Sequence, residues 1–303
     1  MKKVLIADGL QKNAVEQLKD LGIEVIERHF EQEELGEALK EFDAVVIRSA
    51  SKINKAVLDK ELGGKLKLII RGGVGVDNID VDYAVKNGII VKNTPNASSV
   101  SVAELAIAHI FALARFINIS NVTMRDGKWN KKKYVGTEIT GKTLGVVGLG
   151  RIGRETAKRA AALGMKVIYF DFIGEIPGVS EYEYYKLDEL LAKSDFISLH
   201  VPYDAKQGSL IGKEEFAKMK EGAYIINCAR GKVVDEAALL EALNSGKVAG
   251  AGIDVFEQEP TQNLELVSHP KVSVTPHIGA STNEAQEKIG EEVVNIIKEF
   301  FNL

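Results

Sequence analysis

The sequence has 303 residues, of which 45% are hydrophobic and 27% are charged. At roughly 150 residues per domain, this composition predicts a folded chain of about two domains and excludes disorder, collagen and an extended coiled coil. The 39 basic and 43 acidic residues leave a net charge of −4, which provides no electrostatic footprint for nucleic acid or an anionic membrane.

The first part of the chain alternates short apolar runs with amphipathic stretches. A strand, a helix and a second strand are predicted at residues 4–7, 12–21 and 24–27. The same order of segments recurs at residues 144–147, 151–163 and 166–170. Strands that alternate with helices are typical of parallel sheets. The sequence therefore predicts an α/β fold, with two doubly wound parallel-sheet domains of the Rossmann or flavodoxin type and a cleft between them.

The segment that joins the two repeats begins with a loop over residues 93–97, and a long helix is predicted near residues 98–118. This helix lies in the longest apolar stretch of the chain. Glu104, His109 and Arg115 interrupt that stretch, so we predict no transmembrane segment. A single cysteine, with no histidine and cysteine cluster at zinc-ligand spacing, predicts a cytoplasmic protein without a metal site.

The last predicted elements are a strand over residues 271–275 and a serine-led amphipathic helix between residues 280 and 301. We expect this helix to return to the first domain, so that the chain crosses twice between the domains. The predicted limits are residues 1–94 with 281–303 for one domain, and residues 95–280 for the other.

A glycine motif, GLGRIG, follows the predicted strand over 144–147 and opens the next predicted helix. In this context Gly148 permits a tight turn, Gly150 allows a pyrophosphate to approach the backbone, and Gly153 allows the helix to pack on the strand. The phosphates would meet the amides of the first helical turn. The motif predicts a dinucleotide site.

An acidic residue follows at the position that ribose recognition requires. Asp171 ends the next predicted strand, 18 residues after Gly153, and would accept hydrogen bonds from the ribose hydroxyls. Its charge would repel a 2′-phosphate, and the neighbouring Phe172 and Ile173 supply no arginine to neutralise one. The sequence therefore predicts NAD as the cofactor in preference to NADP.

Three ionisable residues follow three apolar strands of the same repeat: Arg230, Glu259 and His277. Ligands bind at the carboxyl ends of parallel strands. Hydride transfer to a ketone requires a proton donor, and the reverse reaction requires an acceptor, so His277 is the predicted acid/base. Glu259 would fix the tautomer of the imidazole, and Arg230 would hold a substrate carboxylate. Each residue alone could be a solvated loop residue, but three at one sheet edge favour a site.

Taken together, these motifs resemble the D-isomer-specific 2-hydroxyacid dehydrogenase family over nearly the whole chain. The resemblance is carried by IRSAS, GVGVDNID, NTPN, VAEL, GKTLGVVGLGRIGRE, NCARGKVVDEAAL, DVFEQEP and PHIGAST. It implies that Arg230, Glu259 and His277 are the catalytic residues. It also implies a homodimer through the region from Ser98 to Phe116. The domain of residues 95–280 would bind NAD, and the other would bind substrate.

The resemblance also assigns ligand contacts to individual positions. The resemblance implies NAD contacts at Arg151, Ile152, Asp171, Cys228, Ala229, Asp254, His277 and Gly279. The glycine motif adds Gly148, Gly150 and Gly153, and the strand-end residues His200 and Arg230 complete the predicted set. The implied substrate contacts are Arg48, Ser49, Arg71, Gly72, Gly73 and Val74, together with Arg230 and His277.

Two of the implied substrate contacts, Arg48 and Arg71, are arginines at predicted strand ends. Two cations suit a doubly anionic substrate, because a cation without an anionic partner would cost desolvation energy. The expected activity is NAD-dependent oxidation of D-3-phosphoglycerate to 3-phosphohydroxypyruvate, which begins serine biosynthesis. The alternatives are a hydroxypyruvate, glyoxylate or D-lactate reductase and an NAD(H)-sensing binding protein on the same scaffold. Many family members carry a regulatory extension, and because the sequence stops at Leu303 we expect no serine feedback through one.

Overall fold

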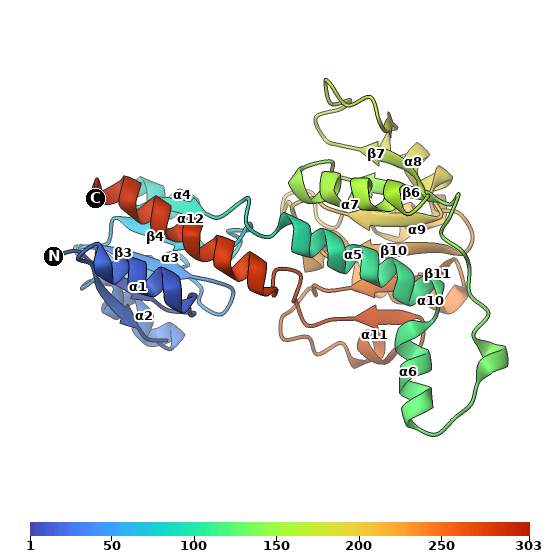
Figure 1. Ribbon diagram of the computed structural model, residues 1–303, viewed down its shortest axis with the longest axis horizontal. Coiled ribbons are helices and arrows are strands. Elements are labelled where there is room, and N and C mark those ends of the chain that lie inside the picture. The colour runs from blue at the N-terminus through green and yellow to red at the C-terminus, as the bar shows by residue number, and fades with distance from the viewer. The chain divides into compact units, whose positions relative to one another are not determined.

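The computed structural model describes residues 1–303, which divide into two compact units (Figure 1). One unit contains residues 1–98 and 280–303, and the other contains residues 99–279. Both units are built on wholly parallel sheets with helices. The predicted class of two doubly wound α/β domains is confirmed.

The first unit has a five-stranded sheet in the order β2-β1-β3-β4-β5. Its strands are β1 (Lys3–Ile6), β2 (Glu24–Glu27), β3 (Ala44–Ile47), β4 (Leu68–Arg71) and β5 (Ile90–Asn93). Its helices are α1 (Lys12–Asp20), α2 (Gln32–Leu39), α3 (Lys55–Glu61), α4 (Val81–Lys86) and α12 (Asn283–Phe301). The strand order reverses between β1 and β3, and ligands of such sheets bind where this reversal opens a crevice at the carboxyl ends.

Two apolar layers cover this sheet. Helices α1 and α12 pack on one face and lie side by side, because a Cβ added at Gly290 of α12 would lie 2.9 Å from Cβ of Ala14 in α1 (Figure 1). Helices α2, α3 and α4 cover the other face. The last helix of the chain therefore belongs to the first unit.

The second unit has a seven-stranded sheet in the order β12-β11-β10-β9-β6-β7-β8. Its strands are β6 (Thr143–Val147), β7 (Lys166–Phe170), β8 (Glu183–Tyr184), β9 (Phe196–Leu199), β10 (Ala223–Asn227), β11 (Val248–Ile253) and β12 (Val272–Val274). Its helices are α5 (Ser99–Ala114), α6 (Ile117–Arg125), α7 (Arg151–Ala162), α8 (Leu187–Lys193), α9 (Lys213–Lys218), α10 (Glu236–Ser245) and α11 (Leu264–Ser268). The order reverses between β6 and β9, which places the glycine motif after β6 at the switch point.

The helices of the second unit form two layers. Helices α5 and α7 lie side by side on one face of the sheet, where Arg159 of α7 pairs with Glu104 of α5 at 3.2 Å (Figure 1). Helices α8 to α11 cover the other face. No single helix of the chain is both long and apolar enough to span a membrane; α5 and α6 meet that length and composition only as a pair bent by 64°.

The long helix predicted near residues 98–118 is present as α5 but ends earlier, at Ala114, because the chain breaks between α5 and α6. Phe116 has a φ of 55°, in the left-handed region. The amide of Thr137 donates to the carbonyl of Ala114 at 2.9 Å, and a Cβ at Gly136 would lie 2.3 Å from that carbonyl oxygen. A distant segment therefore caps the end of α5, and the local apolar pattern holds no signal for this contact.

The start of the last helix also differs from the expectation. A threonine rather than a serine caps it, because Oγ1 of Thr282 accepts from the amide of Ala285 at 3.1 Å. The helix begins at Asn283, so residues 280–282 belong to the preceding loop. Ser281 and Thr282 are both capping types, with serine slightly preferred, so the sequence favoured the wrong one and the backbone geometry decides.

Candidate active site

The glycine motif forms a tight turn between β6 and α7. Gly148 has a φ of 92°, and a Cβ there would lie 2.7 Å from the Val201 side chain. A Cβ at Gly153 would lie 2.0 Å from the Gly148 carbonyl oxygen, so only glycine lets α7 approach the turn. Gly150 is exposed, and a Cβ there would meet no atom within 4 Å. The turn leaves open space above Gly150, beside the first amides of α7.

The acidic residue predicted from the spacing lies beside this turn. Oδ2 of Asp171 accepts from the amide of Leu149, inside the glycine motif, at 2.9 Å. A pocket of about 320 Å³ lies at the same edge and is lined in part by Phe172, Pro202 and Tyr203. A carboxylate and a pocket with apolar and polar walls thus flank the glycine turn, which suits an adenosine ribose and its base.

The predicted acid/base pair forms within the second unit. Nδ1 of His277 lies 2.7 Å from Oε2 of Glu259, and Oε1 of Glu259 accepts from the amide of Phe256 at 3.1 Å. The side chains of His277 and Glu259 are 38% and 37% exposed, so the pair is open to a ligand. Because the ionised carboxylate only accepts, Nδ1 of His277 carries the proton, and the unbonded Nε2 is the atom that can exchange one.

The charge of Glu259 is stabilised by its surroundings. Burial disfavours the carboxylate, but the hydrogen bond and charge of His277, the Phe256 amide and the charge of Arg230 outweigh it and lower the pKa of Glu259. Glu259 is therefore ionised at neutral pH, and it holds the imidazole in one orientation.

Arg230 is placed beside this pair by the loop that follows β10. The side chain of Asn227, at the end of β10, donates to the carbonyl of Arg230 at 2.9 Å and accepts from the amide of Ala229 at 3.0 Å. A Cβ at Gly231 would lie 1.8 Å from the carbonyl oxygen of Phe256, so this loop touches the segment that leads to Glu259. Sequence reasoning found Arg230 but missed Asn227.

Some of the other predicted NAD contacts lie at the start of α7, and others are shielded residues at the ends of strands. Arg151 is exposed and Ile152 half-buried in the first turn of α7. Cys228 and Ala229 are buried, and burial raises the pKa of the Cys228 thiol well above its usual value, so the thiol is neutral. Burial lowers the pKa of His200 to about 3, and its Nε2 bonds the Ser198 hydroxyl at 2.9 Å. A neutral His200 carries no charge toward a phosphate.

Asp254 is fully buried, and both of its carboxylate oxygens are engaged by the protein. Oδ1 accepts from the Thr275 hydroxyl at 2.6 Å and from the Ile278 amide at 2.9 Å, and Oδ2 accepts from the Gly279 amide at 2.9 Å. In this structure Asp254 therefore fixes the loop that carries His277 at the end of β12.

The substrate contacts implied in the first unit lie at the carboxyl ends of β3 and β4. Arg48 and Ser49 follow β3, Arg71 ends β4, and Gly72 to Val74 follow it. A Cβ at Gly73 would lie 1.4 Å from Nη1 of Arg71, so this glycine makes room for the guanidinium. Both arginines therefore share one edge of the five-stranded sheet.

Two residues that sequence reasoning missed hold the Arg48 loop. Oδ2 of Asp8, which follows β1, accepts from the amide of Arg48 at 2.7 Å and from the amide of Ser51 at 3.0 Å. Nδ2 of Asn78 donates to the carbonyls of Arg48 and Ser51 at 2.6 Å and 2.7 Å. Asp8 stands directly after a predicted strand, and that position at the switch point was its only signal.

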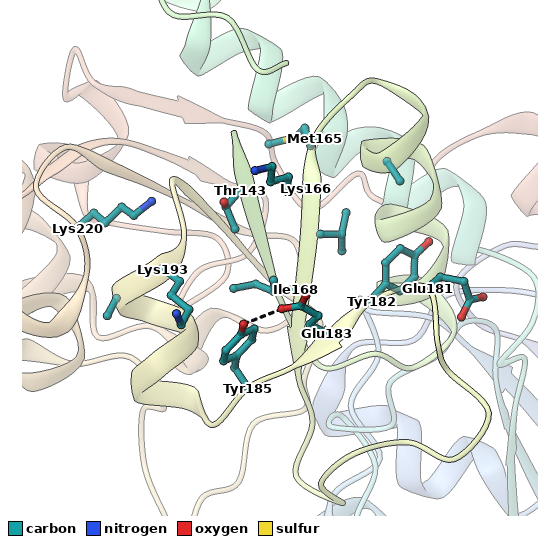
Figure 2. Close-up of a pocket in the computed structure, with 13 residues that line it drawn as sticks. Thr143, Met165, Lys166, Ile168, Glu181, Tyr182, Glu183, Tyr185, Lys193 and Lys220 are labelled. Carbon is teal, nitrogen blue, oxygen red and sulfur yellow. Dashed lines mark hydrogen bonds between the residues drawn. The ribbon is translucent and has the colours of Figure 1, made fainter. Parts of the chain in front are cut away.

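A further pocket of about 660 Å³ in the second unit lies away from the predicted residues (Figure 2). Thr143 and Lys166 in its wall are the first residues of β6 and β7, so the pocket lies at the amino ends of the strands. Figure 2 shows Tyr185 among the lining side chains, with its hydroxyl donating to Glu183 at 2.7 Å. The glycine turn lies at the opposite ends of these strands, so this pocket is separate from the cofactor edge.

Comparison with known proteins gives consistent results. The model of the D-isomer specific 2-hydroxyacid dehydrogenase NAD-binding domain matches residues 107–279. The D-3-phosphoglycerate dehydrogenase of Methanocaldococcus jannaschii is 45% identical over 303 residues, which covers 98% of this chain and 57% of that protein. The chain belongs to the D-isomer-specific 2-hydroxyacid dehydrogenase family.

Other members of the family act on different compounds. The hydroxypyruvate reductase of Thermotoga maritima is 47% identical over 303 residues, with 97% of each chain covered. The solved D-lactate dehydrogenase of Aquifex aeolicus, complexed with NAD and lactic acid, has a TM-score of 0.86 and 35% identity over 99% of this chain and 95% of that chain. The chain spans little more than half the length of the phosphoglycerate dehydrogenases it matches.

The cofactor of this family is NAD, and the residues present fit it. The open space above Gly150 and the first amides of α7 suit the pyrophosphate, and Asp171 suits an unphosphorylated ribose. His277 and Arg230 follow other strands of the same parallel sheet, at its carboxyl edge. The matched domain therefore contains both the predicted cofactor turn and the predicted catalytic residues.

Proposed function

We propose that this protein oxidises D-3-phosphoglycerate to 3-phosphohydroxypyruvate with NAD as the hydride acceptor. Family membership and the His277–Glu259 hydrogen bond of 2.7 Å support a 2-hydroxyacid dehydrogenase. The observation that favours a phosphorylated substrate is the pair of arginines, Arg48 and Arg71, at one sheet edge of the first unit.

The Arg48 guanidinium is a partly desolvated cation that a bound anion would stabilise. Burial lowers the pKa of the guanidinium, and the charge of Asp8 offsets only part of this effect. No hydrogen bond or ion pair engages the guanidinium, because Asp8 uses its oxygens on backbone amides and the Ser51 hydroxyl. A phosphate would compensate the desolvated charge through a charge-assisted hydrogen bond.

In the proposed reaction, Arg230 holds the substrate carboxylate through its planar guanidinium. Nε2 of His277 takes the proton of the substrate hydroxyl during oxidation and returns it to the ketone oxygen during reduction. Glu259 accepts from Nδ1 and stabilises the imidazolium that forms. When bound, NAD supplies the acceptor for the hydride that leaves the substrate carbon.

Phosphate recognition is tested by Arg48→Gln and Arg71→Gln. We expect each variant to raise KM for D-3-phosphoglycerate by about 10- to 100-fold, the range expected for a lost hydrogen bond to a charged group. KM for D-lactate should change less than about threefold, because its methyl group needs no cation. Steady-state kinetics with both acids measures the difference.

Arg125→Gln is the matched control, because Arg125 lies on α6 and bonds Asn121 there. It should leave both KM values unchanged. Equal losses for the phosphorylated and unphosphorylated acids in the Arg48 and Arg71 variants would refute phosphate recognition by these residues.

The alternative is a reductase of hydroxypyruvate, favoured by the 47% identity to the Thermotoga maritima enzyme over 97% of both chains. A panel of D- and L-hydroxy acids and their keto partners, followed by NADH absorbance at neutral and alkaline pH, separates the two substrates. A higher kcat/KM for hydroxypyruvate than for 3-phosphohydroxypyruvate would replace our proposal. Binding of NADH without turnover of any acid would instead indicate a nucleotide-sensing protein.

We also propose that the protein is a homodimer through the region of α5 and α6. Exposed apolar side chains follow α5, with Ile117, Val122 and Met124 of α6 each more than half exposed and Trp129 at 77%. Apolar surface of this kind is typical of interaction sites. Light scattering should give twice the 33.0 kDa chain mass, and Val122→Glu should shift the protein toward monomer. A monomeric wild-type protein at micromolar concentration would exclude the dimer.

A further inference from the structure

One buried histidine takes no part in the proposed reaction. His109 of α5 is 2% exposed, and both of its ring nitrogens are engaged: Nδ1 with the Ser273 hydroxyl at 3.0 Å and Nε2 with the Thr275 hydroxyl at 3.2 Å. A Cβ at Gly252 of β11 would lie 2.7 Å from Cβ of His109, so a glycine inside a buried strand makes room for this side chain. The fold therefore provides a fitted position for the imidazole.

The direction of these hydrogen bonds follows from proton counting. The Thr275 hydroxyl has one proton, and it donates this proton to Oδ1 of Asp254, which as a carboxylate can only accept. The bond between Thr275 and His109 must then use Nε2–H as the donor. Burial lowers the pKa of His109, although the charge of Asp254 opposes this effect, so the ring is neutral and Nδ1 accepts from Ser273.

The chain of bonds ends on the loop that carries His277. Asp254 accepts from the amides of Ile278 and Gly279 at 2.9 Å each, and its carbonyl accepts from the amide of His277 at 2.8 Å. His277 has a φ of 53°, a left-handed conformation that costs about 1–2 kcal/mol and persists only where the surroundings hold it. The bonds to Asp254 hold it from the backbone side, together with the bond of the His277 amide to the Thr275 carbonyl at 3.1 Å and that of its side chain to Glu259.

We propose that His109 and Thr275 are positioning residues that orient Asp254 and thereby fix the His277 loop. Four side chains form a one-way series of three hydrogen bonds, from Ser273 through His109 and Thr275 to Asp254. Successive bonds in such a series polarise one another, and a buried carboxylate that lost one donor would rotate or admit water. The consequence for turnover rests on the proposed function, whereas the consequence for loop order does not.

Amide hydrogen exchange of residues 276–280 in the cofactor-free protein tests the loop directly. Thr275→Val keeps the shape of the side chain and removes the hydroxyl, and His109→Leu removes the donor to it. We expect each variant to speed exchange in this segment by about five- to tenfold, the factor that one net hydrogen bond contributes. Exchange of β9, the central strand of the sheet, should stay at the wild-type rate.

Ser273→Ala is the matched control. It removes the outer bond of His109 but leaves the donors to Thr275 and Asp254 in place, so exchange of residues 276–280 should change far less than in the other two variants. Thr275→Ser and His109→Gln each restore a donor at the right position and should restore wild-type protection. Unchanged exchange in folded Thr275→Val and His109→Leu proteins, or equal acceleration by Ser273→Ala, would overturn the proposal.

Kinetics supply the second measurement. A displaced imidazole should lower kcat about tenfold in Thr275→Val and in His109→Leu. KM for the hydroxy acid should change less than about twofold, because both side chains bond inside the domain and neither is a predicted substrate contact. His109→Gln should recover most of the lost kcat. If the wild-type protein turned over no hydroxy acid, the proposed function would fail while the exchange experiment would still decide the role of His109.

Discussion

His277→Asn is expected to lower kcat for the hydroxy acid by about two to four orders of magnitude, the usual contribution of a positioned proton donor. Glu259 engages Nδ1 of His277, so Nε2 is the ring nitrogen that can exchange a proton with substrate. Asparagine tolerates the left-handed φ of 53° at this position, so the loop should keep its conformation. Steady-state kinetics and NADH fluorescence titration measure turnover and cofactor binding separately.

The control for this variant is His269→Asn, which changes a histidine at the end of α11, where its Nδ1 accepts from the amide of Lys271. It should leave kcat unchanged, and NADH affinity should change less than about threefold in both variants. A His277→Asn protein with wild-type kcat would remove His277 from the mechanism. His277→Ala adds backbone strain to the loss of the imidazole, so its melting temperature should fall below that of His277→Asn.

Much of the fold could be predicted because the parallel strands are short, buried and separated by amphipathic helices. The predicted strands over 24–27 and 166–170 match β2 and β7 at both ends. The other predicted strands differ by one residue at one or both ends, because a strand ends where its hydrogen bonds to the neighbouring strand end. The break between α5 and α6 could not be predicted, because the segment that caps Ala114 comes from residues 136–137.

Part of the candidate site could also be predicted from the sequence, and part could not. The glycine turn and Asp171 lie within one βαβ unit, so their spacing in sequence fixes their spacing in space, and the amide of Leu149 bonds Asp171 as that geometry requires. The proximity of Glu259 and His277 depends on the pairing of β11 with β12, which the sequence predicts only as neighbouring elements.

The residues that hold the site in place from other parts of the chain could not be predicted from the sequence. Asp8 holds the amide of Arg48 from 40 positions away, and His109 bonds Thr275 from 166 positions away. A buried polar residue on an apolar helix, such as His109, indicates that a partner exists but not where in the chain it lies. The partner, Thr275, can be identified only from the strand order, which brings α5 against β11 and β12.

Replacement of Asp171 is the prediction that tests the cofactor site. Asp171→Asn keeps an acceptor for the Leu149 amide and removes the charge that would repel a 2′-phosphate. We expect the preference for NAD over NADP, measured as the ratio of kcat/KM values, to fall by about 100-fold, which corresponds to about 2.8 kcal/mol. Most of this change should come from improved use of NADP, with a smaller loss for NAD as the ribose hydroxyls lose a charged acceptor.

A second substitution distinguishes charge repulsion from a general loosening of the site. Phe172 is 55% exposed beside Asp171, so an arginine there could reach a 2′-phosphate without disturbing the core. Asp171→Asn with Phe172→Arg should lower the preference for NAD further, whereas Phe172→Arg alone should have little effect, because Asp171 would pair with the new cation. If Asp171→Asn lost activity equally with both cofactors, Asp171 would be a structural residue of the glycine turn, and the selectivity for NAD would have to arise elsewhere in the domain.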